Sequence, residues 1–307
     1  MQEQTITALR ESLAAAGLPF VQDEPLAGHT TFKIGGPAAF WCTPHNAEEL
    51  RSTLALCREN GARVYLLGNG SNTLFDDAGF DGAVIDMRGV AEMEHSDADN
   101  DVVRITAGAG QTLGRLCSKA QALGLTGLEF ACGIPGTVGG AVYMNAGAYG
   151  GEMKDVLTTV QYLTAEGEVK ESAASELDLR YRHSIFEENG GCILSAQFAL
   201  TPGEPEAIRA KMDELMAKRL DKQPLDKPSA GSTFKRPVGA FAAALIDQCG
   251  LRGYRHGGAA VSEKHCGFVV NLGGASCADV LALCEEVRTI VKEKTSYDLE
   301  KEIRVVR

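Results

Sequence analysis

Two glycine-bearing segments carry the residue types best suited to binding a ligand that contains phosphate. The first, Gly68-Asn69-Gly70-Ser71-Asn72, follows a short apolar stretch at residues 63–67 that is typical of a strand. Its glycines permit positive φ, which lets successive backbone N–H groups point toward one anion. Taken alone, the motif is equally typical of a surface turn.

The second segment runs from Gly133 to Gly147 and mixes glycines with apolar side chains such as Ile134, Val138 and Val142. Backbone without Cβ atoms beside hydrophobic walls suits a flat, partly apolar ligand that bears phosphates. The alternative is a loop packed tightly under a neighbouring helix. The chain contains neither a Walker motif nor a strand–G-x-G-x-x-G–helix unit, which argues against a P-loop or Rossmann fold.

The composition excludes several classes of protein. A net charge of −11 argues against binding to nucleic acid or to anionic membranes. The start of the chain lacks the pattern of a signal peptide and no run of eighteen apolar residues occurs, so we expect a cytoplasmic protein without membrane insertion. Nothing in the sequence indicates an obligate protein partner.

The nine cysteines and the histidines do not indicate a metal site. The cysteines include no C-x-x-C pair and are expected to be reduced, mostly buried thiols. Four histidines lie in loop-like sequence without a second ligand at i+3 or i+4, so we expect no metal. They are His29, His183, His256 and His265.

The elements that must position these segments alternate between helices and strands. Apolar spacing predicts helices that end at Gly17, Gly61, Gly124 and Gly250. Two further helices are expected, one at residues 203–219 and one that begins at Cys277. In the last helix Ser276 is the expected N-cap, with Asp279 as the second residue of a capping box. Prolines and a glycine near residue 202 predict a domain boundary near 201. Strands are expected at 63–67, 83–87, 102–107, 192–200 and 299–306, with a hairpin of 156–164 and 167–171 across Glu166-Gly167.

The two glycine segments resemble, in their order and in their amino-acid sequence, those of the UDP-N-acetylenolpyruvoylglucosamine reductase (MurB) family. Four further segments match the same family, and the likeness extends from about residue 20 to the end. They are His29–Gly36, Leu179–Phe186, Pro228–Pro237 and Leu299–Arg304. Only some twenty residues separate Ser184 from the helix at Glu206, which resembles the short, type II members.

The resemblance implies an α+β fold with an FAD-binding domain of the vanillyl-alcohol oxidase (PCMH) type. This domain would comprise two α+β subdomains, residues 1–90 and 91–200. A C-terminal α+β substrate-binding domain, residues 201–307, would follow, and its last strand can pack back on the FAD domain. The residues implied to bind FAD non-covalently are Gly68, Asn69, Gly70, Ser71, Asn72, Gly133, Gly136, Thr137, Gly139, Gly140 and Ala141.

The implied reaction, in peptidoglycan precursor synthesis, uses NADPH and FAD to reduce the enolpyruvyl ether of UDP-N-acetylglucosamine to UDP-N-acetylmuramate. Hydride from flavin N5 to the terminal vinyl carbon leaves negative charge on the adjacent carbon, which requires a cation and then a proton donor. By the resemblance Arg182 is the cation, Ser232 the proton donor and Glu302 the third catalytic residue. The implied UDP-sugar contacts are Tyr149, Tyr181 and Lys222, with Lys222 on the diphosphate.

Other interpretations of these residues stay open. Without the resemblance, Arg182 is typical of a surface ion pair, Ser232 of a turn or capping hydroxyl, and Glu302 of a cross-strand ion pair. One rival function is another FAD oxidoreductase of the same fold, such as a sugar or lactone oxidase. A second is a non-catalytic nucleotide-binding or scaffold protein. Arg236 departs from the family pattern, in which many members have Asn at that position.

Overall fold

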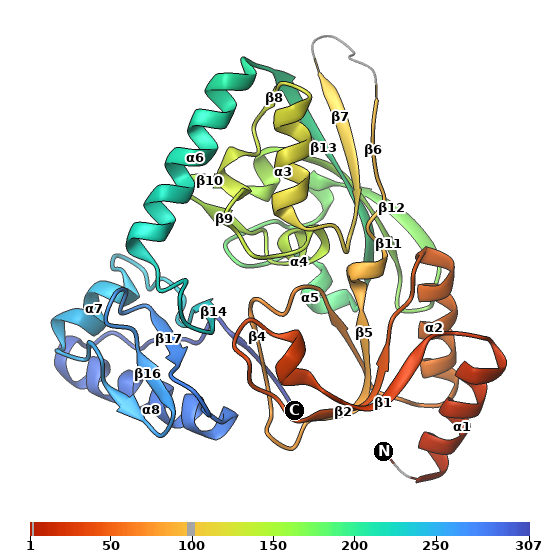
Figure 1. The fold of residues 1–307 in the computed structure, drawn as a ribbon, viewed down its shortest axis with the longest axis horizontal. Helices are drawn as coiled ribbons and strands as arrows, with labels where there is room; N and C mark the ends of the chain where they lie inside the picture. The colour runs from red at the N-terminus through yellow and green to blue at the C-terminus, as the bar shows by residue number, and fades with distance from the viewer. Residues whose placement is uncertain (2, 97–101) are drawn as a thin grey trace. The chain divides into compact units, whose positions relative to one another are not determined.

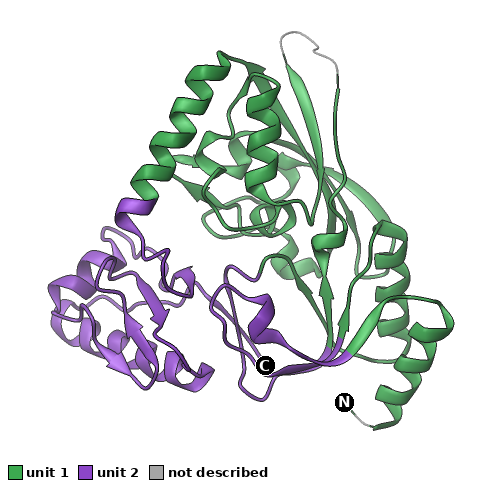
Figure 2. Ribbon diagram, in the orientation of Figure 1, with its two compact units in different colours: residues 1–21, 41–69, 83–219 green, residues 22–40, 70–82, 220–307 purple. Residues whose placement is uncertain are grey.

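The computed structural model describes residues 1, 3–96 and 102–307 of the 307-residue chain. These residues form two compact units (Figure 2). The first unit contains residues 1–21, 41–69 and 83–219, and the second contains residues 22–40, 70–82 and 220–307. Each unit therefore combines segments that are far apart in sequence. The three-domain division at residues 90 and 200 stays a prediction, and the chain passes between the two units at other positions.

The largest sheet lies in the first unit and is antiparallel (Figure 1). Five of its strands follow the order β12-β11-β13-β7-β6, and β8 pairs with the far end of β13. Buried and half-buried side chains alternate along most of β13, as expected for a strand with one face on the core. The hairpin predicted across Glu166-Gly167 is confirmed, because β11 and β12 pair directly. The strands are β6 (Met93–His95), β7 (Val103–Gly108), β8 (Leu125–Thr126), β11 (Leu157–Leu163), β12 (Val169–Ala173) and β13 (Cys192–Pro202).

A second sheet has the strand order β1-β2-β5-β3, with β3 and β5 parallel. Helices α1 and α2 lie side by side (Figure 1), and the buried leucines Leu9, Leu13 and Leu50 fall at the predicted helical spacing. The strands are β1 (Phe20–Pro25), β2 (Pro37–Cys42), β3 (Val64–Leu67) and β5 (Phe80–Asp86). The helices up to residue 222 are α1 (Glu3–Ala15), α2 (Ala47–Glu59), α3 (Leu113–Ala122), α4 (Val138–Tyr143), α5 (Phe186–Asn189) and α6 (Pro205–Lys222).

The second unit contains an antiparallel sheet of order β14-β17-β16-β15, against which α8 packs. It also holds a parallel pair, β4 and β18, which joins residues 73–75 to the end of the chain. The capping box predicted for α8 is confirmed, because Ser276 and Asp279 exchange hydrogen bonds between side chains and backbone N–H groups. The elements are β4 (Thr73–Phe75), β14 (Ser229–Ser232), α7 (Ala242–Gln248), β15 (Arg255–His256), β16 (Ala259–Val261), β17 (Phe268–Asn271), α8 (Cys277–Thr295) and β18 (Arg304–Val306).

The expected cysteine environment is confirmed, because eight of the nine free thiols are buried and only Cys132 is half-buried. Burial raises the pKa of the Cys42 and Cys57 thiols to about 12. Among the described residues, no helix has the length and apolar character needed to cross a membrane.

Candidate active site

The two glycine segments lie against each other in the first unit. A Cβ atom built on Gly68, just after β3, would lie 2.3 Å from Oγ1 of Thr137. One residue further on, Asn69 donates from Nδ2 to the carbonyl oxygen of Pro135 at 2.7 Å. The fold therefore brings together two segments that are separated by more than sixty residues and were each predicted to bind the same ligand.

The second segment is held by backbone contacts with residues 109–111. Val138 donates its N–H to the Gln111 carbonyl and Gly139 to the Ala109 carbonyl, both at 2.8 Å. A Cβ on Gly139 would lie 2.8 Å from the Ala109 Cβ, so only glycine fits there. Thr137 caps the short helix α4 by accepting the N–H of Gly140 at 3.4 Å. Gly139 thus makes a close protein contact on its Ala109 side.

The rest of the first segment belongs to the second unit. Gly70 has φ +60°, and its carbonyl accepts the Thr31 N–H at 3.2 Å. Asn72 donates from Nδ2 to the carbonyl of Glu302 at 3.2 Å and accepts the Arg304 N–H at 2.9 Å. Within the described chain, the N–H groups of Gly70 and Ser71 donate to no protein acceptor. Free donors beside bare backbone fit the phosphate groups of an FAD molecule.

Tyr149 occupies the tip of a two-residue hairpin between β9 (Gly147–Ala148) and β10 (Gly151–Glu152). Its φ is +53° and that of Gly150 is +91°, which is the conformation such hairpins require. A Cβ on Gly151 would lie 2.7 Å from the Phe130 ring, so the hairpin packs closely on that residue. The Tyr149 side chain remains 47% exposed and is available to a ligand.

Tyr181 and Arg182 form the tip of a second tight turn. Arg180 and His183 exchange backbone hydrogen bonds of 3.2 Å in both directions, which closes the turn. Arg182 has φ +56°, and its guanidinium lies 5.1 Å from the centroid of the Tyr181 ring. A left-handed conformation costs a non-glycine residue about 1–2 kcal/mol, and such strain is concentrated at functional sites.

One buried amide, Asn145, connects the two turns. Its Nδ2 donates to Oε2 of Glu152 at 2.8 Å and to the Arg180 carbonyl at 3.2 Å, and its Oδ1 accepts the Lys154 N–H at 3.0 Å. A hydrogen bond from Lys154, assisted by Asn145 and the Arg182 charge, holds the pKa of Glu152 below its usual range although burial opposes this. Asn145 was not among the predicted residues, and its only signal was a single amide within an apolar, glycine-rich segment.

Ser232 and Glu302 lie on adjacent backbone segments of the second unit. Ser232 ends β14 opposite Phe268, after a register shift between Ser229 and Ser232, and the intervening Gly231 has φ +74°. The N–H of Glu302 donates to the carbonyl of Thr233, the next residue after Ser232, at 2.8 Å. Both side chains are half-buried. The structure thus brings two of the three predicted catalytic residues together, whereas Arg182 belongs to the first unit.

The remaining predicted residue, Lys222, is the exposed last residue of α6. Arg236, which departs from the family pattern, lies with its guanidinium 4.6 Å from the centroid of the Phe241 ring.

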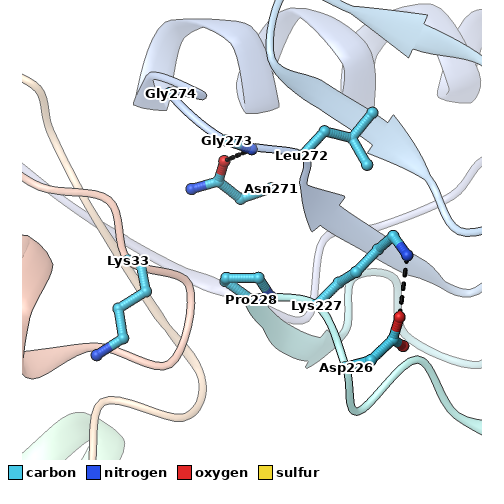
Figure 3. A pocket seen from close by; sticks show the side chains of 8 residues that line it. All are labelled: Lys33, Asp226, Lys227, Pro228, Asn271, Leu272, Gly273 and Gly274. Atoms are coloured by element: carbon cyan, nitrogen blue, oxygen red, sulfur yellow. Dashed lines mark hydrogen bonds and ion pairs between the residues drawn. The ribbon is translucent and has the colours of Figure 1, made fainter.

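A separate open pocket of about 470 Å³ lies in the second unit (Figure 3). Within it Asn271 accepts the Gly273 N–H at 2.8 Å, and Lys227 pairs with Asp226 at 3.0 Å. None of the predicted site residues lines this pocket. Its lining residues are Lys33, Asp226, Lys227, Pro228, Asn271, Leu272, Gly273 and Gly274.

Comparisons with known proteins cover nearly the whole chain. Residues 38–173 match the model of an FAD binding domain, and residues 223–306 match that of the UDP-N-acetylenolpyruvoylglucosamine reductase C-terminal domain. Together they confirm the predicted fold class. The reductase of Agathobacter rectalis is 49% identical over 100% of this chain and 99% of its own length. That of Lachnoclostridium phytofermentans is 48% identical over 92% of each chain.

A solved structure gives the same result. The crystal structure of UDP-N-acetylenolpyruvylglucosamine reductase (MurB) from Thermus caldophilus matches with a TM-score of 0.78 and 36% identity, over 94% of this chain and 99% of that one. Both the sequence and the fold are therefore similar to those of one family over almost their full length. The chain belongs to the UDP-N-acetylenolpyruvoylglucosamine reductase family.

Proposed function

We propose that this chain reduces UDP-N-acetylglucosamine enolpyruvate to UDP-N-acetylmuramate and is a type II member of its family. As a member, it is a flavin-dependent reductase of peptidoglycan precursor synthesis that uses FAD and NADPH and acts on a UDP-sugar. The observation that carries the proposal is the contact between the two glycine segments, through Gly68, Asn69 and Thr137. We place the reaction in the cytoplasm, where NADPH and UDP-sugars are found.

The glycine segments would hold FAD without a covalent link. The free N–H groups of Gly70 and Ser71 suit a phosphate, and the apolar residues of the segment 133–147 suit a flat ring system. When bound, FAD supplies hydride transfer from NADPH to the double bond of the substrate. The residues proposed to hold it are Gly68, Asn69, Gly70, Ser71, Asn72, Gly133, Gly136, Thr137, Gly139, Gly140 and Ala141.

Arg182 would bind the substrate carboxylate and stabilise the negative charge that develops beside it. The rigid fork of a guanidinium suits this task, and the turn closed by Arg180 and His183 fixes the backbone that carries it. Tyr149, Tyr181 and Lys222 would contact the UDP-sugar.

Ser232 would complete the reaction by protonating the carbanion. Hydride addition at the terminal vinyl carbon moves an electron pair to the adjacent carbon, and the Ser232 hydroxyl transfers its proton to that carbon. Glu302, hydrogen-bonded through its N–H to the residue after Ser232, would return a proton to the hydroxyl.

The test separates the two half-reactions under anaerobic conditions. NADPH is added to the purified protein, then UDP-N-acetylglucosamine enolpyruvate, while flavin absorbance is followed. We expect ping-pong kinetics, and we expect Ser232→Ala to keep flavin reduction but lose reoxidation and product. Ser229→Ala, at the other end of the same strand, is the matched control. Equal loss of both half-reactions would refute the role of Ser232, and a protein that binds no flavin would refute the proposed function itself.

A further inference from the structure

Arg219, on the last turn of α6, is a half-buried cation that the proposed mechanism does not use. A Cβ built on Gly133 would lie 2.9 Å from its Cδ and 3.7 Å from its Nε, so the arginine stem packs directly on the second glycine segment. Among the described residues, none forms an ion pair or a hydrogen bond with its guanidinium. Arg209 on the same helix is instead exposed, and its Nε lies 3.3 Å from Oδ2 of Asp213.

The surroundings of this guanidinium favour an anion that the protein does not supply. Burial lowers the pKa of Arg219, and the neighbouring Tyr149 and Cys132 side chains offset this only in part. A partly desolvated charge without a carboxylate partner is unfavourable, which is why buried charges in folded proteins are normally paired. A ligand that brings negative charge to this point would remove that penalty.

The neighbours also indicate which kind of anion would bind. Gly133 belongs to the segment proposed to hold FAD, and Tyr149 is proposed to contact the UDP-sugar. FAD, the UDP-sugar and NADPH share one anionic group, the diphosphate, whereas the substrate carboxylate already has Arg182 as its proposed partner. A guanidinium offers donors in a fixed fork that matches two phosphate oxygens.

We propose that Arg219 is a binding residue for the diphosphate of a nucleotide ligand. The inference rests on the proposed function and adds a cation to its site. Losing a charge-assisted hydrogen-bonded pair weakens binding by about ten- to a hundredfold. Arg219→Gln should lower the affinity for one diphosphate ligand by this factor. Arg219→Lys keeps the positive charge but not the forked donors of the guanidinium, so it should restore part of the affinity.

Three measurements distinguish the source of the diphosphate. Fluorescence titration of apoprotein gives the FAD affinity, calorimetry gives the affinity for UDP, and anaerobic flavin reduction gives the NADPH dependence. A selective loss in one of these identifies the ligand. Arg209→Gln, on the same helix, should leave all three unchanged. The inference is wrong if the FAD affinity, the UDP affinity and the NADPH dependence of Arg219→Gln all stay within about twofold of wild type. Such a change is smaller than the effect of losing a charged hydrogen bond.

A second variant shows whether a loss of binding in Arg219→Gln comes from misfolding. Arg219→Met keeps an apolar side chain against Gly133 but removes the guanidinium, so it should weaken the same ligand as Arg219→Gln. Wild-type protein that binds neither FAD nor UDP would overturn the proposed function. Normal binding by wild type and by both variants would overturn only the role of Arg219.

Discussion

Replacing Asn145 with alanine should uncouple the two turns that carry Tyr149 and Arg182. The buried amide donates to Glu152 and to the Arg180 carbonyl and accepts the Lys154 N–H. Alanine removes all three hydrogen bonds at once. It also places a side chain with no compensating hydrogen bond at φ +39°.

The size of the effect follows from these contacts. Each net hydrogen bond contributes about 0.5–1.5 kcal/mol, so three contribute about 2–4 kcal/mol. The left-handed backbone adds about 1 kcal/mol for alanine relative to asparagine, which tolerates it better. A total loss of about 3–5 kcal/mol is a large part of a typical unfolding free energy of about 5–15 kcal/mol. The melting temperature should fall on the order of 10 °C.

The assay combines calorimetric melting with steady-state kinetics on the holoenzyme. Asn145 belongs to the second glycine segment, but the partners of its amide, Glu152, Arg180 and Lys154, lie outside both segments. We therefore expect Asn145→Ala to retain FAD but to lose about tenfold or more in kcat/KM through misplacement of Arg182. Asn189→Ala is the matched control, since the Asn189 side chain is exposed and, within the described part of the chain, accepts only the nearby Gly191 N–H. A melting temperature within about 2 °C of wild type, or an unchanged kcat/KM, would refute the reasoning.

Three further predictions concern the cofactor loops, a helix cap and a histidine. Gly68→Ala should weaken FAD binding in apoprotein titrations, because its Cβ would lie 2.3 Å from a threonine oxygen of the second segment. Gly28→Ala is the control, since its Cβ would meet none of the described residues within 4 Å. Asp77→Ala should lower the unfolding free energy by about 1–2 kcal/mol, since Asp77 accepts two N–H groups at the start of α8. Burial lowers the pKa of His265, so stability should fall as pH drops below about 6.5, and His265→Gln should reduce this fall.

The sign of the histidine effect follows from its hydrogen bond. Nδ1 of His265 accepts the Gly267 N–H at 3.2 Å, which requires an unprotonated nitrogen. Because the pKa of His265 is lower in the folded chain, the unfolded chain binds a proton on this side chain more readily as the pH falls. Protonation therefore favours unfolding. Melting curves of wild type and His265→Gln that keep the same separation from pH 7.5 to 5.5 would contradict this. For Asp77, equal melting of the alanine variant and wild type would contradict the capping role.

Helices were the part of the fold that the sequence predicted best. Apolar spacing and terminal glycines located α1, α2, α3, α6, α7 and α8, because both signals are local. Strands β1, β2 and β4 were missed. The three residues of β4 pair with β18 at the end of the chain, more than 200 residues away, and no local pattern records such a contact. The final strand was also predicted too long, as the segment before Arg304 bonds with residues 233–235 instead.

The glycine segments show where residue type alone leaves two explanations open. A missing Cβ permits close approach by a ligand or by the protein itself, and the sequence is the same in either case. In the structure Gly68 and Gly139 make close protein contacts, with Thr137 and Ala109 respectively, and both are also among the residues proposed to hold FAD. The sequence contains no signal for the proposed role of Arg219 for a related reason. Its lack of a carboxylate partner among the described residues depends on packing between α6 and the segment at Gly133.

At position 145, two separate requirements determine the residue type. The backbone at φ +39° requires a residue that tolerates the left-handed region, and the neighbouring turns require an amide that donates twice and accepts once. Glycine meets only the first requirement. Aspartate tolerates the backbone and can accept the Lys154 N–H, but it would place a second carboxylate beside Glu152. Only asparagine satisfies both, so the positions of Tyr149 and Arg182 depend on a side chain that is itself not expected to touch the substrate.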